Sequence, residues 1–181
     1  MSIRLSLLAI LDQGACYGHQ LRAEFDRRTG GESPVNAGQV YSTLDRLERD
    51  GLVTKAQPDA DGAIYYRITG EGSAAVADWF DSPVLRGAGR DELAIKVALA
   101  ATLPGVDVLR VIALQRRAAG SLPAAEGLAV AIILDARREA AEAELRWLDR
   151  VEERIAGEPD PKLPLNTEVP KRGRPSRARS S

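Results

Sequence analysis

A short stretch of the sequence, residues 35–53, combines an apolar stripe with side chains suited to contacting a nucleic acid. Val40, Leu44 and Leu47 recur at helical spacing, so they predict the buried face of an α-helix. Winding that helix at about 100° per residue gathers hydrogen-bonding and cationic groups on one flank, namely Gln39, Ser42, Thr43, Arg46 and Arg49. Glutamine and hydroxyl groups can bond to base edges, and arginine to bases or phosphates. We therefore interpret Gln39, Ser42 and Thr43 as candidate base contacts, and Arg46 as a candidate for either role.

The residues on either side of this helix define its ends. Asn36 is placed to cap the first free amides, and Gly51 supplies the left-handed residue that ends a helix. An extended segment follows directly over residues 52–54. A polar-faced helix that runs into a strand is typical of a winged helix-turn-helix, in which this helix reads the major groove. An ordinary amphipathic helix with a solvated outer face is the alternative for this stretch alone.

The segments around this helix predict the remainder of such a domain. Residues 3–12 are apolar almost all round, as in a buried helix, and a second helix is predicted over 17–28. Two strand-like runs, 52–57 and 63–68, are joined by turn-forming residues and predict a hairpin, the wing. Thr69 is placed to cap the helix that follows. The predicted fold class is therefore mainly α with a small β-hairpin.

The C-terminal half is rich in Ala, Leu, Glu and Arg and predicts three helices, over 90–103, 105–120 and 124–156. The last helix is longer than a small domain is wide, which favours a second subunit as its partner in a coiled-coil-like pairing. Apolar residues recur along it at three- and four-residue steps. We expect the dimerisation contact to be made by Leu134, Leu145, Leu148 and Ile155. The helices before it are the alternative partner.

Residues 158–181 contain too many prolines for regular structure and predict a disordered basic tail. Within it, Lys171-Arg172-Gly173-Arg174-Pro175 is similar to an AT-hook, in which an extended Arg-Gly-Arg-Pro segment lies in the minor groove of A·T-rich DNA. Arg172 and Arg174 are therefore candidate minor-groove contacts. A plain solubilising tail is the alternative.

Composition and residue counts exclude several classes of function. A formal net charge of −1 means that any nucleic acid must be engaged by local patches. Cys16 is the single cysteine, which rules out an internal disulfide and fits a cytoplasmic protein. The apolar run at 5–11 is too short to span a membrane. The one histidine, His19, has no partners at metal-binding spacing, and no glycine loop suits a phosphate. We expect no enzyme activity, no cofactor and no metal.

Several motifs together resemble PadR-type transcriptional regulators, over essentially all of residues 3–156. In the winged-helix half they are Tyr17-Gly18, the run Tyr41 to Val53, and Tyr66-Arg67-Ile68-Thr69-Gly70-Glu71-Gly72. In the C-terminal half, Arg90 to Lys96 and Trp147 to Arg150 are similar to the virulence-activator-like domain of the family's longer subfamily. The combination and its order carry the resemblance, rather than any one motif.

The resemblance implies a winged helix-turn-helix over residues 1–82 and a helical dimerisation domain over 83–157. It implies a homodimer that binds a palindromic operator in double-stranded DNA, usually as a repressor, and in some members is released by a small-molecule effector. Tyr41 matches the family's tyrosine in the reading helix and is a candidate phosphate contact, with a rim tyrosine as the alternative. Further candidate phosphate contacts, each of which could equally be a solvated charge, are Arg22, Lys55 and Arg67.

The wing departs from the family pattern. The family is commonly basic just before the paired tyrosines, whereas Asp59 and Asp61 stand there in this sequence, and Lys55 and Arg67 are the cations that remain. Strong contact between this wing and phosphate is therefore in question. Trp147, on the long helix, is a candidate for the wall of an effector pocket, with a place in the core as the alternative.

These observations predict a dimeric, sequence-specific DNA-binding repressor. One rival is a protein-interaction module that kept the fold and lost DNA binding. The other is an architectural DNA binder that acts through its tail. The operator, the regulated genes, the effector and the sign of regulation do not follow from the sequence.

Overall fold

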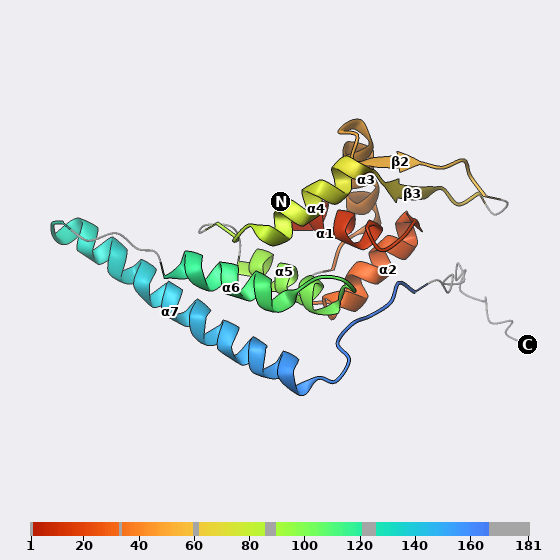
Figure 1. Ribbon diagram of the computed structural model, residues 1–181. Helices are drawn as coiled ribbons and strands as arrows, with labels where there is room; N and C mark the ends of the chain where they lie inside the picture. Colours follow the sequence, from red (N-terminus) through yellow and green to blue (C-terminus); the bar gives the residue numbers. More distant parts are fainter. Residues whose placement is uncertain (1, 33, 60–61, 86–89, 121–125, 167–181) are drawn as a thin grey trace, which may run out of the picture.

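The computed structural model describes residues 2–32, 34–59, 62–85, 90–120 and 126–166, and its elements follow the predicted order (Figure 1). The N-terminal half consists of α1 (Ser2–Leu11), β1 (Cys16–Tyr17), α2 (Gly18–Arg28), α3 (Ala37–Arg49), β2 (Val53–Lys55), β3 (Tyr65–Ile68) and α4 (Gly70–Asp81). The C-terminal half consists of α5 (Arg90–Thr102), α6 (Val108–Ala119) and α7 (Leu128–Gly157). The prediction of a mainly helical winged helix with a long last helix is confirmed.

Helix α1 lies at the centre of the molecule because it is apolar almost all round. Leu7, Leu8, Ile10 and Leu11 are each at most 1% exposed, and α1 packs against α2, α4 and α5. The buried residues of both halves form one continuous hydrophobic cluster that extends from Leu7 to Leu148. The winged helix and the helices after it therefore share a core.

The wing belongs to a sheet with one more strand than the sequence predicts. The strand order is β1-β3-β2, and both pairings are antiparallel. The added strand pairs Cys16 with Tyr66 and Tyr17 with Tyr65. A strand of two residues is too short to give a periodic signal, which is why the sequence indicated only a break there.

The helix ends follow the predicted capping residues. The Asn36 side chain accepts a hydrogen bond from the Gln39 amide at 2.8 Å at the start of α3, and the Thr69 hydroxyl accepts one from the Gly72 amide at 3.1 Å at the start of α4. Gly51, just after α3, has φ +74°. Because the Thr69 hydroxyl also donates to the Gly51 carbonyl at 2.8 Å, one side chain ties the end of α3 to the start of α4.

The two halves are joined by a buried lysine. Lys96 on α5 is 2% exposed, and its ammonium donates to the backbone carbonyls of Trp79 and Ser82 at the end of α4. The ammonium also lies 5.6 Å from the centre of the Trp79 ring. Burial lowers the pKa of Lys96 to about 8.

Residues 158–166, which we call the strap, differ from the prediction of a tail that is disordered from residue 158. The strap leaves the end of α7 and runs back to α2 (the last blue segment in Figure 1). The Leu163 amide donates to the Thr102 carbonyl at 2.8 Å, and the Lys162 ammonium donates to the carbonyls of Ala100 and Val106 at 2.9 and 2.8 Å. The strap is therefore part of the folded structure.

Candidate nucleic-acid interface

The outward face of α3 carries most of the predicted base contacts. Gln39, Ser42 and Arg46 are exposed, as predicted for a reading helix. Thr43 is 6% exposed and is excluded from this face by its burial. Its position explains the error, because Val40, Thr43, Leu44 and Leu47 are spaced i, i+3, i+4, i+7 and so form the inward stripe. A threonine at the i+3 position of that stripe should have been assigned to the core.

Two hydrogen bonds order the exposed side chains along the helix. The Ser42 hydroxyl donates to the Gln39 carbonyl at 3.1 Å, and Nε of Arg46 donates to the Ser42 carbonyl at 3.1 Å. The Arg46 guanidinium is therefore held against its own helix, one turn from Ser42. A guanidinium in this place offers its terminal nitrogens to a base edge or a phosphate.

Tyr41 stands between α3 and the start of α2. Tyr41 is 46% exposed, and its ring lies so close to Gly18 that a Cβ there would be 2.6 Å from Cε1 of Tyr41. This contact explains why a glycine opens α2, since any side chain would displace the ring. Tyr41 therefore lies at the edge of the α3 face. Contact between its hydroxyl and a phosphate is a proposal.

The two candidate cations of the wing, Lys55 and Arg67, differ in their surroundings. The Lys55 ammonium is 3.0 Å from Oε2 of Glu48 and 3.5 Å from Oδ1 of Asp45, both on α3. The hydrogen bond that the Lys55 ammonium donates to the Glu48 carboxylate raises the pKa of Lys55. Arg67 is exposed on β3, opposite Thr54 of β2. Lys55 therefore fastens the wing to α3, and a phosphate must compete with two carboxylates for it.

The acidic tip of the wing has a structural explanation in Asp59. The Asp59 carboxylate accepts a hydrogen bond from the Ala63 amide at 2.8 Å, and the Asp59 amide donates to the Ala63 carbonyl at 2.9 Å. Gly62, with φ +76°, completes the turn. Asp59 therefore closes the hairpin. The sequence showed only that an acidic residue stands where the family is commonly basic, and it did not indicate this role.

The remaining predicted DNA contacts lie on α2 or in the tail. Arg22 is half-buried and forms an ion pair with Asp26 at 3.8 Å. Arg172 and Arg174 lie outside the described residues.

The four α7 residues that were predicted to form the dimer contact pack within the single chain. Leu134 is 3% and Leu148 0% exposed, Leu145 is half-buried, and Ile155 packs against the core. These side chains are covered because α7 packs along α6, which was the alternative partner. The assignment of Leu134 and Leu148 to a dimer contact is therefore corrected.

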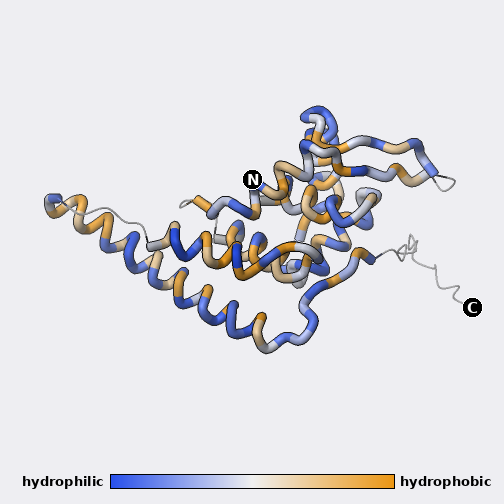
Figure 2. The backbone as a smooth tube through the Cα atoms, in the orientation of Figure 1, coloured by the Kyte–Doolittle hydropathy of each residue, from blue (hydrophilic) through white to orange (hydrophobic). Residues whose placement is uncertain are grey.

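The apolar residues that α7 leaves exposed lie at its other end. Figure 2 shows them as hydrophobic segments where α7 extends beyond the rest of the molecule. They are Leu128, Val130, Ile132 and Ile133, between 46% and 79% exposed. Val130 belongs to the apolar stripe that the sequence pattern identifies along this helix, whereas Leu128, Ile132 and Ile133 were not assigned to it.

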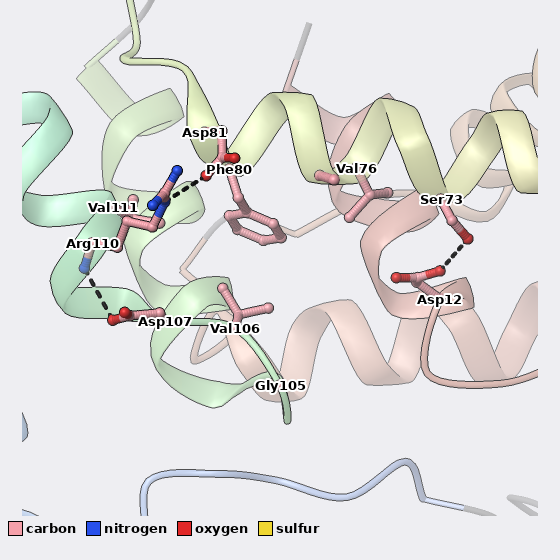
Figure 3. Close-up of a pocket in the computed structure, with 11 residues that line it drawn as sticks. Asp12, Ser73, Val76, Phe80, Asp81, Gly105, Val106, Asp107, Arg110 and Val111 are labelled. Carbon is pink, nitrogen blue, oxygen red and sulfur yellow. Dashed lines mark hydrogen bonds and ion pairs between the residues drawn. The ribbon is translucent and has the colours of Figure 1, made fainter.

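A pocket of about 310 Å³ lies between α4 and α6, and Trp147 does not line it. Figure 3 shows Phe80, Val76 and Val106 facing the space, with Asp12 and Asp81 at its edges. Arg110 forms an ion pair with Asp81 at 2.8 Å. Trp147 instead packs against the core, which was the alternative for this residue.

Two kinds of feature are absent from the described residues. No helix among them is long and apolar enough to cross a bilayer. No group of three or more His, Cys, Asp or Glu side chains in this part of the chain is arranged to hold a metal ion.

A family model matches the N-terminal half of the chain. Residues 7–78 match the Transcriptional regulator PadR-like family. No curated protein matches the chain. Among solved structures, a transcriptional regulator from Clostridium thermocellum is 25% identical, over 42% of this chain and 75% of that chain, with a TM-score of 0.41. RosR of H. salinarum is 33% identical, over 43% and 68% of the two chains, with a TM-score of 0.39.

A further solved structure covers more of the chain at lower identity. Bacillus subtilis PadR in complex with operator DNA is 17% identical, over 86% of this chain and 99% of that chain, with a TM-score of 0.43. The assignment rests on the family match to the winged-helix segment, which contains α3 and the wing. The winged-helix segment, residues 7–78, belongs to the transcriptional regulator PadR-like family.

Proposed function

We propose that this protein is a sequence-specific DNA-binding repressor that acts as a homodimer on a palindromic operator. The observation that carries the proposal is the exposed polar face of α3, with Gln39, Ser42 and Arg46 on a helix whose other face is fixed in the core. A rigid helix with polar groups on its outward face is what major-groove reading needs. Family membership supports the same function.

The electrostatics support a proposal of different roles for α3 and the wing. Lys55 is held by Glu48 and Asp45, so the wing contributes little unpaired positive charge, and Arg67 is its candidate phosphate contact. Base contacts from α3 must therefore supply most of the specificity. This division favours a protein that discriminates between sequences over one that binds any duplex.

The dimer in this proposal pairs the N-terminal ends of two α7 helices. Leu128, Val130, Ile132 and Ile133 are exposed there although they are large and apolar, and such residues gathered at one helix end favour a protein contact. A second copy is the proposed partner because a palindromic operator requires two reading helices related by a twofold axis.

The effector-responsive part of the proposal belongs to the pocket between α4 and α6. Its lining includes the apolar Phe80 and Val111, and among the described residues that line it three carboxylates, Asp12, Asp81 and Asp107, stand against one cation, Arg110. An apolar floor with an acidic rim favours a small amphipathic cation over an anion. A thermal-shift titration with an aromatic amine and the matching aromatic acid tests this part. Equal shifts with both compounds, or none with either, would remove it.

Footprinting on the DNA upstream of the protein's own gene tests the main proposal. We expect protection of an inverted repeat by the wild-type protein, and loss of that protection with Gln39→Ala and Arg46→Ala combined. A protein-interaction module would protect no site. An architectural binder would protect A·T-rich DNA without an inverted repeat, and would be unaffected by the α3 substitutions. A reporter gene behind the protected site then gives the sign of regulation, and a rise in expression when the gene is deleted is the result expected of a repressor.

A further inference from the structure

Side chains of α2 bind the backbone of the strap. They donate hydrogen bonds to three strap carbonyls, from Arg28 to Leu163 at 2.8 Å, from Arg27 to Pro164 at 2.6 Å and from Gln20 to Asn166 at 2.7 Å. Every residue of a peptide carries a backbone carbonyl. These contacts therefore recognise the path of a peptide backbone rather than particular side chains.

The spacing of these donors fits an extended chain that runs antiparallel to α2. Gln20 and Arg28 are eight residues apart, which is about 12 Å along a helix. Leu163 and Asn166 are three residues apart, which is about 10 Å along an extended chain. Because the two lengths agree, one face of α2 can hold successive carbonyls of one peptide.

The end of α5 offers the complementary groups, because the last carbonyls of a helix have no partner within it. The Lys162 ammonium donates to the carbonyls of Ala100 and Val106 at 2.9 and 2.8 Å. The Leu163 amide donates to the Thr102 carbonyl at 2.8 Å. A cation at this end of a helix is also favoured by the helix dipole. A peptide bound here therefore needs a lysine directly before its first bound carbonyl.

The strap completes the hydrogen bonds of a buried ion pair on α2. The side chains of Arg28 and Glu24 are 0% and 2% exposed. The guanidinium donates to the Leu163 carbonyl, and the carboxylate accepts from the Asn166 amide at 3.2 Å. Burying an ion pair costs free energy unless its hydrogen bonds are satisfied. Both charged groups would lose a partner without the strap, so the packing of α2 depends on it.

Two features of the strap suit a peptide ligand. Leu165 packs against the core beside Gly14, so one side chain adds an apolar contact to the backbone hydrogen bonds. Pro161 and Pro164 restrict the backbone and have no N–H group that needs a partner, so less conformational entropy is lost on binding. The strap-binding surface, formed by α2 and the end of α5, therefore fits an extended Lys-Leu-Pro-Leu-Asn segment.

This surface lies on the helix that supports the reading helix. Helix α2 packs against α3, and Gly18, two residues before Gln20, lies against the ring of Tyr41. At its other end the strap continues from α7 (Figure 1). The strap therefore connects the long helix to the helix on which α3 rests.

We propose that the strap-binding surface is a peptide-binding site, and that its occupation by the strap holds α2, and through it α3, in the position that binds DNA. The coupling to DNA rests on the proposed function, whereas peptide binding does not. The ligand is the Lys-Leu-Pro-Leu-Asn segment of the same chain. Tethering keeps the site filled, because an attached ligand has an effective concentration of about millimolar.

Cutting the folded full-length chain beside the strap tests the site without DNA. Residues 158–160 are exposed and can be replaced by the recognition sequence of a site-specific protease. After cleavage, the C-terminal fragment becomes a separate peptide. Gel filtration over a dilution series should show it bound to the remainder of the chain at high concentration. A fragment that separates at every concentration would overturn the proposal.

Matched variants of the cut protein identify the contacts. Gln20→Ala with Arg27→Ala removes two donors to the strap, and it should release the fragment at concentrations where the wild-type protein retains it. His19→Ala with Arg117→Ala removes side chains at exposed positions and should retain the fragment. Lys162→Gln leaves the surface of α2 unchanged and should also weaken retention. Equal retention in all three variants would overturn the proposal.

Hydrogen exchange and operator affinity of the uncut chain test the coupling to α3. Leu165→Asp places a charge against the core and should detach the strap without changing α2 or α3. We expect faster amide exchange in α2 and about 5-fold or more weaker operator binding, with unchanged circular dichroism. Unchanged exchange, or wild-type affinity despite faster exchange, would overturn the coupling. A wild-type chain that retains its cut fragment but protects no operator would overturn the proposed function and leave the peptide site standing.

Discussion

Gln39 and Arg46 both lie exposed on α3, but their substitution should affect the affinity for DNA and its salt dependence differently. Gln39→Ala should weaken operator binding by roughly 1–3 kcal/mol, about 5- to 150-fold, if the amide pairs with a base. Arg46→Ala should do the same at a base, whereas at a phosphate it should lower the salt slope by about 1 and weaken all sequences alike. Fluorescence anisotropy at several salt concentrations measures both effects.

Arg117→Ala is the control for these two substitutions, because Arg117 is exposed on α6. It should bind the operator as the wild-type protein does. Wild-type affinity in both α3 variants would contradict the assignment of this face to DNA.

At the residue scale, we expect Glu48 to weaken DNA binding, because its carboxylate holds the Lys55 ammonium at 3.0 Å. Glu48→Gln should release Lys55 toward phosphate and tighten binding by roughly 2- to 5-fold at low salt, with a smaller gain at high salt. Operator titrations at two ionic strengths measure the change. Glu139→Gln makes the same change of charge on exposed α7, and an equal gain from both variants would show that the Lys55 pair is not responsible.

At the scale of elements, Gly72 determines how closely α4 approaches the start of the wing. A Cβ at Gly72 would lie 2.3 Å from the Leu52 backbone oxygen, whereas a Cβ at Gly70 would meet nothing within 4 Å. Gly72→Ala should therefore lower the free energy of unfolding by about 1–3 kcal/mol. Gly70→Ala, in the same helix, should leave it unchanged or raise it by up to about 1 kcal/mol.

Chemical denaturation with urea measures both values. The comparison isolates the contact with Leu52, because the two variants make the same chemical change in the first turn of one helix. Equal stabilities would mean that α4 can move away from the wing at little cost. In that case the tie between the end of α3 and the start of α4 would not be rigid enough to fix the position of the exposed α3 face.

The elements that carry a local signal were predictable, and those fixed by distant partners were not. The stripe of Val40, Leu44 and Leu47 and the Asn36 cap are local, so α3 was found within a residue or two. The strap depends on contacts such as Arg28 to Leu163, which are separated by 135 residues. No periodic pattern reports such a contact. The spacing of Glu24 and Arg28 did offer the i, i+4 signal of an ion pair.

The difference between local signals and distant contacts also explains which features of the candidate site could be predicted. Exposure of Gln39, Ser42 and Arg46 followed from helical geometry, whereas the pairing of Lys55 with Glu48 required the wing to fold onto α3. The inward use of Leu148 also depended on tertiary structure, because α6 and a second subunit offer the same kind of apolar surface. Sequence periodicity identifies a face that must be covered, but not the element that covers it.

At the scale of the whole molecule, the length and position of α7 bear on how two copies of the chain would pair. Its 30 residues make a helix about 45 Å long, and its C-terminal part is covered by α6 and the core. The N-terminal part extends past the other helices (Figure 1). A dimer formed there would hold the two winged helices apart, and both could read DNA together only on half-sites spaced by a whole number of helical turns.

Replacing Ile132 and Ile133 together with glutamate tests this arrangement. The two side chains are 61% and 54% exposed, so the change should leave the fold of one chain intact. Charged groups buried in an apolar contact are strongly unfavourable, so we expect the dimer to dissociate. Sedimentation should give half the wild-type mass, with unchanged circular dichroism and much weaker binding to the full palindrome. Ala74→Glu, at an exposed position on α4, should remain dimeric. A monomeric wild-type protein, or a dimeric double variant, would contradict the α7 interface, and in the second case the contact must lie on another surface.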